Sequence, residues 1–186
     1  MYIRKLLWAA RSIINMPFYK HYGINGYMGK PILIAGKKHI SIGNRVRIQP
    51  GLRMETFKDG TIYIHDNVSI GQNFHCTSAG KLIIGKDTTI LGNTFITNID
   101  HEYRTIGVHV MDQPMIVKDT FIGENCFIGY GAAIQAGTKL GKQCVVGTNA
   151  VVRGEYPDYS VIVGVPAKIV KRYNSETKEW EKVDGY

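Results

Sequence analysis

The stretch that decides the fold is residues 122–152, which read IGENCFIGYGAAIQAGTKLGKQCVVGTNAVV. An aliphatic residue returns at every sixth position, at Ile122, Ile128, Ile134, Leu140, Val146 and Val152. A small residue stands four positions after each of the first five, at Cys126, Ala132, Thr138, Cys144 and Ala150. Strand side chains repeat every two residues and helical ones about every 3.6, so neither element alone explains a period of six. A short strand followed by a tight corner does, and the pattern predicts a parallel β-helix of hexapeptide repeats.

The same register extends towards the amino terminus, with short slips between its runs. Its earlier members are Ile42, Ile48, Ile64, Ile70, Cys76, Ile84, Ile90 and Ile96. Three hexapeptides complete one triangular turn, so residues 32–152 predict about five or six turns around a continuous aliphatic core. A β-sandwich with coincidental spacing is the alternative, and the unbroken run of matches argues against it. Glycine directly follows four aliphatic positions, at Gly123, Gly129, Gly141 and Gly147. We attribute these glycines to backbone angles that other residues resist.

The composition fits one cytoplasmic domain that meets anionic partners. The chain has 186 residues and a formal net charge of +8, and no acidic residue precedes Glu55. Such a basic excess favours phosphates, membrane surfaces or nucleic acid, but no nucleic-acid-binding module accompanies the charge. The three cysteines have neither metal-ligand nor disulfide-framework spacing. The sequence shows neither an apolar run of transmembrane length nor a signal peptide. We therefore expect a cytoplasmic location and no nucleic-acid partner.

Residues 1–16 form a separate amphipathic unit. Its apolar residues have helical spacing and comprise Ile3, Leu6, Leu7, Ala10, Ile13 and Ile14. Pro17 should end this helix near Met16. One interpretation is a helix that caps the open end of the solenoid. The other is an interfacial helix with Trp8 and the arginines at a membrane surface, which would place the protein peripherally at the inner membrane face.

A break in the register predicts a functional loop. After Ile96 the chain leaves the hexapeptide pattern and resumes it near Ile116, which predicts an extruded loop over residues 101–115. Long loops on a regular solenoid are commonly functional. His101 stands at the root of this loop, where a rigid coil can hold an imidazole that takes a proton from a hydroxyl.

Three features together resemble the hexapeptide-repeat acyltransferases. They are the six-residue register, the Asp100-His101 pair that opens the loop, and the sequence VGVPAK at residues 163–168. The resemblance covers residues 32–172 and is greatest to the galactoside, maltose and virginiamycin type O-acetyltransferases and to those that decorate O-antigen or capsule sugars. It implies a left-handed parallel β-helix, a homotrimer with active sites between subunits, and acetyl-CoA as donor with no metal required. Residues 1–31 would then be a helix and connector, and residues 173–186 a C-terminal tail.

The resemblance also implies roles for individual residues. His101 would be the general base that activates a saccharide hydroxyl, with Asp100 or Glu102 orienting its ring. The acetyl-CoA site would comprise Phe127, Gly129, Tyr130, Gly147, Thr148, Arg153, Lys168 and Lys171. Phenylalanine where the family often has tryptophan, and lysines in place of arginines, are departures that weaken stacking and phosphate contacts. From their places in the register, the acceptor-binding candidates are His75, Asn73, Ser78, Met54 and Glu55.

We therefore expect an acetyl-CoA-dependent O-acetyltransferase that acts on a saccharide, such as a precursor of O-antigen or capsule. A γ-type carbonic anhydrase is the alternative with another chemistry, but His101 and His109 lack the close pairing of its zinc site. A β-helical scaffold without chemistry is the non-enzyme alternative. Amino-sugar N-acetyltransferase and serine acetyltransferase activities also stay open, since the base and donor site are shared.

Overall fold

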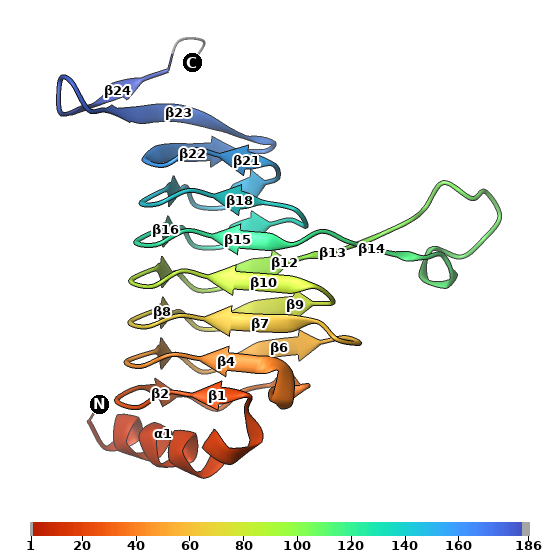
Figure 1. The fold of residues 1–186 in the computed structure, drawn as a ribbon, viewed down its shortest axis with the longest axis vertical. Helices are drawn as coiled ribbons and strands as arrows, with labels where there is room; N and C mark the ends of the chain where they lie inside the picture. Colours follow the sequence, from red (N-terminus) through yellow and green to blue (C-terminus); the bar gives the residue numbers. More distant parts are fainter. Residues whose placement is uncertain (1, 184–186) are drawn as a thin grey trace.

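The computed structural model describes residues 2–183 and shows a stack of coils with one helix across its first end (Figure 1). The helix α1 (Tyr2–Asn15) precedes the coils, and short 3-10 helices occupy Met16–Phe18, Lys37–His39 and Val110–Asp112. Three sheets form the sides of the coils. Within each sheet, strands from successive coils pair in parallel. The fold is the parallel β-helix that the hexapeptide register predicts.

Each complete coil contributes one strand to each of the three sheets. The first sheet contains β1 (His21–Tyr22), β4 (Ile40–Ile42), β7 (Thr61–Ile64), β10 (Lys81–Ile84), β15 (Thr120–Ile122), β18 (Lys139–Leu140) and β21 (Glu155–Tyr156). The second contains β2 (Tyr27–Met28), β5 (Arg47–Ile48), β8 (Ser69–Ile70), β11 (Thr89–Ile90), β16 (Phe127–Ile128), β19 (Val145–Val146), β22 (Ser160–Gly164), β23 (Ala167–Asn174) and β24 (Glu179–Lys182). The third contains β3 (Leu33–Ala35), β6 (Arg53–Thr56), β9 (His75–Ser78), β12 (Phe95–Thr97), β17 (Ala133–Ile134) and β20 (Val151–Val152). A separate pair consists of β13 (Ile99–His101) and β14 (Met115–Val117).

The hexapeptide positions form the core. In the first sheet Ile64, Ile84, Ile122 and Leu140 follow one another in register, and each is at most 4 % exposed. The small corner residues Cys126, Ala132, Thr138, Cys144 and Ala150 are buried as well. Because each coil packs its aliphatic side chains on those of the coil before, the apolar core is continuous along the stack.

Close packing, and not backbone angle, requires the glycines after the aliphatic positions. A Cβ at Gly123 would lie 2.2 Å from the carbonyl oxygen of Gly141 in the next coil. The left-handed backbone conformation occurs two residues after each of these glycines, at Asn125, Gly131, Gln143 and Asn149. The explanation from backbone angles is therefore wrong for Gly123: strands about 4.8 Å apart leave no room for a side chain there.

The solenoid begins earlier than the aliphatic register predicts. β1 pairs with β4 and β2 with β5, so residues 21–28, assigned to the connector, already belong to the first coil. Tyr22 and Met28 pair with Ile42 and Ile48 and take the positions that aliphatic residues take in later coils. The first sheet consequently has seven strands, one for each coil. The first coil has a tyrosine and a methionine at its core positions. A search for aliphatic residues at every sixth position therefore does not detect this coil.

The helix α1 covers the open end of the first coil with the face opposite its apolar stripe. The buried Ser12 hydroxyl donates to the Trp8 carbonyl and accepts from the Met28 amide and the Tyr22 hydroxyl, each at 3.0 Å. The Trp8 ring lies against Tyr27, with 5.7 Å between the ring centroids. The stripe residues Leu6, Leu7, Ile13 and Ile14 are exposed. The capping interpretation thus agrees with the position of the helix over the first coil. The apolar stripe of the helix, however, does not pack on the core. Within residues 2–183, no helix is long and apolar enough to cross a bilayer.

The C-terminal segment extends the second sheet beyond the coils. β23 turns back antiparallel on β22, and β24 pairs antiparallel with β23. The rings of Tyr173 and Trp180 meet in this hairpin with 5.7 Å between their centroids. The expected boundary between residues 172 and 173 therefore falls inside β23, and the tail is a continuation of the sheet.

Candidate active site

The break in the register forms a hairpin that projects far from the stack (Figure 1). After β12 the chain enters β13, which pairs antiparallel with β14 and brings Asp100 opposite Ile116 and His101 opposite Met115. Residues 102–114 connect the two strands. His101 ends β13 and therefore stands at the root of the loop, the place that the register break predicts for it.

Asn98 fastens the start of this hairpin to the coil. Its buried amide oxygen accepts a hydrogen bond from the Ala79 backbone amide, and its amide nitrogen donates to Ser78 Oγ, both at 2.9 Å. Its backbone carbonyl accepts from the Lys118 amide, at 2.9 Å, where the chain returns to the coil. Sequence reasoning missed Asn98. The signal in the sequence that could have identified Asn98 is its position. It is a polar residue two positions after Ile96, the core isoleucine that directly precedes the break in the register.

The imidazole of His101 has one nitrogen that the protein encloses. Nδ1 is buried and has no hydrogen-bond partner among the described residues, although the residue as a whole is half-buried. Enclosed polar atoms are usually paired, because an unpaired one costs about 1–3 kcal/mol. Nδ1 is therefore closed to a substrate, and proton transfer with a substrate would use the other ring nitrogen, Nε2.

Neither neighbouring carboxylate orients the His101 ring. Asp100 Oδ1 accepts from the His101 backbone amide at 3.0 Å, and its Oδ2 accepts from Arg153 Nη2 at 2.5 Å. Glu102 accepts from the two backbone amides that follow it and pairs with the Arg104 guanidinium. The His101 amide, followed by Arg153, lowers the pKa of Asp100, and Arg104 lowers the pKa of Glu102 to about 2. The expectation that Asp100 or Glu102 orients the imidazole is not met, because both are ionised and held elsewhere.

Arg153 lies at the same corner of the coils as the hairpin. It directly follows β20, which is two strands beyond β12 in the third sheet, and its guanidinium reaches back to Asp100. The two side chains are 56 % and 41 % exposed. The resemblance places Arg153 beside the pantetheine arm of CoA. In the structure it also ties the hairpin root to the later coils.

The outer face of the third sheet carries two of the five acceptor candidates, His75 and Glu55. Arg53, His75 and Phe95 lie side by side in register on β6, β9 and β12, and the His75 and Phe95 ring centroids are 5.1 Å apart. Glu55 Oε1 accepts from Arg53 Nε at 2.6 Å and lies 4.0 Å from His75 Nε2. Burial, followed by the charge of Arg53, lowers the pKa of His75 and favours its neutral ring.

The other three acceptor candidates have structural contacts. Met54 and Ser78 are fully buried, and the Ser78 hydroxyl donates to backbone carbonyls. Asn73 lies at an exposed corner and donates to Asn93 Oδ1 at 3.0 Å. Alternate residues of a strand face opposite sides of a sheet, so Met54 points inward where Glu55 points outward. Met54 and Ser78 do not reach a substrate in this structure.

Seven of the eight donor candidates, all but Arg153, form a strip on the second sheet and the corner after it. Its exposed side chains are Phe127, Tyr130, Thr148, Lys168 and Lys171, with Gly129 and Gly147 in the coil ladder between them. His101 and Arg153 lie at another corner, between the third sheet and the first. Within one chain, the third sheet therefore separates this donor strip from His101.

Among the described residues, no group of three or more His, Cys, Asp or Glu side chains is placed to hold a metal ion.

Comparisons with known proteins identify the family. A family model described as the hexapeptide repeat of succinyl-transferase matches residues 120–153. WbbJ of Escherichia coli (strain K12), whose name describes an O-acetyl transferase of lipopolysaccharide biosynthesis, is 36 % identical over 179 residues, covering 91 % of this chain and 89 % of WbbJ. This chain belongs to the hexapeptide-repeat acyltransferases. It is an enzyme of that class, and the scaffold interpretation is set aside.

The acyltransferase is similar to two further proteins of different acceptor classes. A galactoside O-acetyltransferase of Lactococcus lactis is 27 % identical over 146 residues, covering 68 % of this chain and 70 % of that enzyme. A structure of AntD, an N-acyltransferase from Bacillus cereus, has a TM-score of 0.75 at 18 % identity and covers 90 % of both chains. The likeness to AntD confirms the left-handed β-helix that the resemblance implies.

Proposed function

We propose that this acyltransferase moves an acetyl group from acetyl-CoA to a hydroxyl of a saccharide, a precursor of a cell-surface polysaccharide such as O-antigen or capsule. The observation that carries this proposal is the place of His101, at the root of a projecting hairpin. The similarity to WbbJ over most of both chains supports a saccharide acceptor.

His101 acts as the general base in direct transfer. Its ring takes the proton of the acceptor hydroxyl while the hydroxyl oxygen attacks the acetyl carbonyl carbon. A C–O bond forms, the carbonyl becomes an oxyanion, and its collapse breaks the C–S bond. The imidazolium then returns the proton to the departing sulfur of CoA. Positioned base catalysis contributes about 10² to 10⁴ in rate, and holding both substrates in one cleft contributes further.

The third sheet supplies groups that fit a sugar. Glu55 and His75 can hydrogen-bond hydroxyl groups, and the Phe95 ring beside His75 offers an apolar face for a pyranose ring. Arg53 fixes the Glu55 carboxylate at 2.6 Å, so this acceptor surface is ordered before a substrate arrives.

The donor strip fits CoA when a second copy completes the site. The exposed rings of Phe127 and Tyr130 suit an adenine, and Lys168 and Lys171 suit phosphates. Because the third sheet separates these residues from His101 within one chain, we propose a homotrimer in which the donor strip of one subunit faces the hairpin of the next. We place the reaction in the cytoplasm, in keeping with the expectation from the sequence.

Turnover assays with acetyl-CoA test the proposal. Thiol release and acetylated product are measured with nucleotide-linked and lipid-linked saccharides, each offered with a hydroxyl or an amine at the accepting carbon. We expect the hydroxyl acceptors to be acetylated and His101→Ala to lose about 10²-fold or more in turnover. His109→Ala, an exposed histidine of the same loop, is the matched control and should stay active.

Three outcomes contradict parts of this proposal. Transfer to amines alone would make the enzyme an N-acetyltransferase. Undiminished turnover by His101→Ala would remove the assignment of the base. A fully active monomer in sedimentation analysis would exclude a site shared between subunits.

A further inference from the structure

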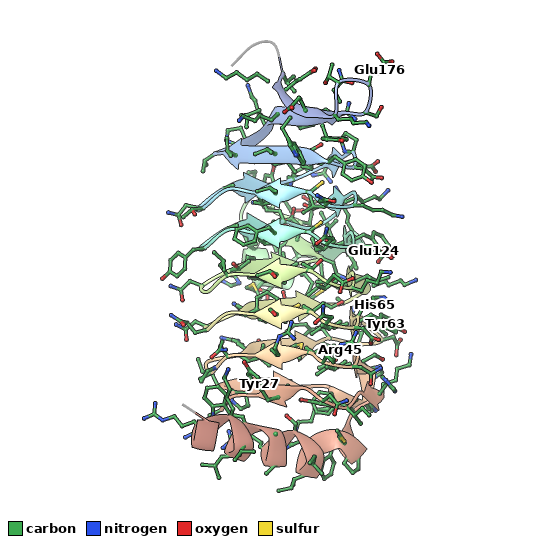
Figure 2. The ribbon with its side chains drawn as sticks, turned by 90° about the vertical axis from the view of Figure 1, so that its left-hand side faces the viewer. Tyr27, Arg45, Tyr63, His65, Glu124 and Glu176 are labelled. Atoms are coloured by element: carbon green, nitrogen blue, oxygen red, sulfur yellow. The ribbon has the colours of Figure 1, made fainter. Side chains whose placement is uncertain are left out.

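The apolar stripe of α1 faces away from the rest of the protein. Leu6, Leu7, Ile13 and Ile14 are 64–71 % exposed, and Phe18 just after the helix is 62 % exposed. Figure 2 shows side chains on the side of α1 away from the coils, with Tyr27 on the opposite, coil side. An exposed apolar surface of this kind commonly marks a site of interaction.

The other face of α1 is anchored, so the stripe cannot turn inward. Besides the contacts of Ser12, the Asn15 side-chain oxygen accepts a hydrogen bond from Lys37 Nζ at 2.8 Å. The Trp8 ring packs on Tyr27, and Lys5 Nζ lies 5.5 Å from the centroid of the same ring. Rotation of the helix would break all of these contacts. Any partner of the stripe therefore lies outside the described residues 2–183.

The part of the chain that forms α1 and the first two coils is basic. Ten basic residues and no acidic one precede Glu55, namely Arg4, Lys5, Arg11, Lys20, Lys30, Lys37, Lys38, Arg45, Arg47 and Arg53. A second copy docked end to end would bring two such surfaces together, and their like charges would repel. The surface of an anionic bilayer offers the opposite charge, together with an apolar interior for the stripe.

A cavity beside α1 extends this apolar surface onto the first coil. Its volume is about 200 Å³, and its lining includes Met28, Ile32 and Leu33 as well as the cations Arg11 and Lys37. Ile32 is 73 % exposed and Leu33 is 40 % exposed. Apolar and cationic groups thus occur together in this cavity, the combination that a phospholipid surface complements.

We propose that α1 is a membrane-docking helix that seats the enzyme on an anionic bilayer. Its apolar stripe enters the boundary between head groups and acyl chains, and the surrounding basic side chains contact lipid phosphates. The 14-residue helix is too short to span, so the attachment is peripheral. Because α1 lies across the end of the stack, the coils stand upright on the bilayer (Figure 1).

In this orientation the third sheet leads from the membrane to His101. Its outer face carries Leu33, Arg53, His75 and Phe95 on successive strands. At about 4.8 Å for each strand, Phe95 lies about 14 Å beyond Leu33, and His101 follows soon after. A saccharide attached through phosphate to a membrane lipid fits this path, with its phosphate near Arg53. This acceptor class rests on the proposed function, whereas the docking does not.

Co-sedimentation of the purified full chain with vesicles tests the docking. Vesicles of phosphatidylcholine with phosphatidylglycerol are compared with vesicles of phosphatidylcholine alone, and we expect binding to the anionic ones that weakens as salt rises. The double variant Leu7→Gln, Ile14→Gln keeps good helix formers and should bind at least about tenfold more weakly. Ile106→Gln is the control, because Ile106 is 94 % exposed in the distant loop, and it should bind like the wild type.

The outcomes separate docking from catalysis. Wild-type protein that ignores anionic vesicles, or a double variant that binds them equally well, would overturn the proposal. A double variant that changes only its sedimenting mass would make the stripe a contact between copies, and would overturn it too. The double variant should retain turnover on a water-soluble acceptor and lose it on an acceptor displayed on vesicles. Absence of turnover in every protein would count against the proposed function alone.

Discussion

Asp100 Oδ2 lies 2.5 Å from Arg153 Nη2, and this contact joins the root of the hairpin to a coil two strands further along the third sheet. Both side chains are partly exposed, so the pair contributes little to global stability, about 0–1 kcal/mol. Its effect is local, because it restrains the strand that carries His101. The pair thus links the position of the proposed base to the coils that carry the donor strip.

Arg153→Met should reduce turnover with little change in melting temperature. Without the ion pair the His101 ring samples more positions, and a small misplacement of a catalytic group lowers kcat, here by about tenfold. Asp100→Asn should produce a similar loss. The double variant should be no worse than either single variant, because both remove the same contact. Additive losses, or a change confined to the KM for acetyl-CoA, would assign Arg153 to donor binding instead.

His75 should make the stability of the protein depend on pH below neutrality. Burial and Arg53 lower its pKa in the folded chain from the ordinary value of 6.5. The unfolded chain therefore binds a proton on His75 more readily than the folded chain does. The contribution of His75 to stability is complete above pH 6.5, and it is lost as the pH falls from 6.5 through the lower pKa of the folded chain. His75→Gln should reduce the dependence of the melting temperature on pH between pH 6.5 and the pKa of the folded chain. His65→Gln, at an exposed histidine, is the control, and a slope unchanged in His75→Gln would show that another group causes the pH dependence.

The core could be predicted because every coil obeys one local rule. Spacing alone identifies Ile128, Ile134 and Val146 as buried, since an aliphatic side chain at each sixth position must point inward. The orientation of α1 could not be predicted in this way. A stripe of leucine and isoleucine normally faces the core, and the contacts of Ser12, Trp8 and Asn15 on the opposite face of α1 reverse that preference.

The place of His101 could also be predicted, because a break in a periodic pattern is visible locally. Its surroundings could not. The Asp100 carboxylate pairs with Arg153, which is 53 residues away in the sequence. A contact between residues so far apart cannot be predicted from the spacing of residues in the repeat. The separation of the donor strip from His101 depends on which corner each residue occupies. That assignment requires the number of residues in every coil, and the slips in register hide it.

Gly123→Ala should destabilise the fold, although the substitution adds only one methyl group. Its Cβ would lie 2.2 Å from the Gly141 carbonyl oxygen, so two hydrogen-bonded coils would have to separate. Overpacking of this kind costs about 1–3 kcal/mol, which should lower the urea midpoint of unfolding. Gly92→Ala is the matched control, because a Cβ there meets nothing closer than 3.2 Å. Equal midpoints for the two variants would show that the coils yield easily at this contact.

Asn98→Leu should free the hairpin from the coil. The substitution keeps a similar volume but removes the two side-chain hydrogen bonds to Ala79 and Ser78. An unpaired buried amide costs about 1–3 kcal/mol, and the hairpin loses its attachment, so trypsin should cleave faster after the exposed Arg104.

Thr77→Val is the control for this prediction. It removes the 2.7 Å contact between the hydroxyls of Thr77 and Thr97 and leaves both side-chain hydrogen bonds of Asn98 in place. It should lower stability without faster cleavage in the loop. If Asn98→Leu also lowered stability but left the cleavage rate unchanged, Asn98 would support the coil alone, and the rigidity of the His101 strand would have to come from the contact of Asp100 with Arg153.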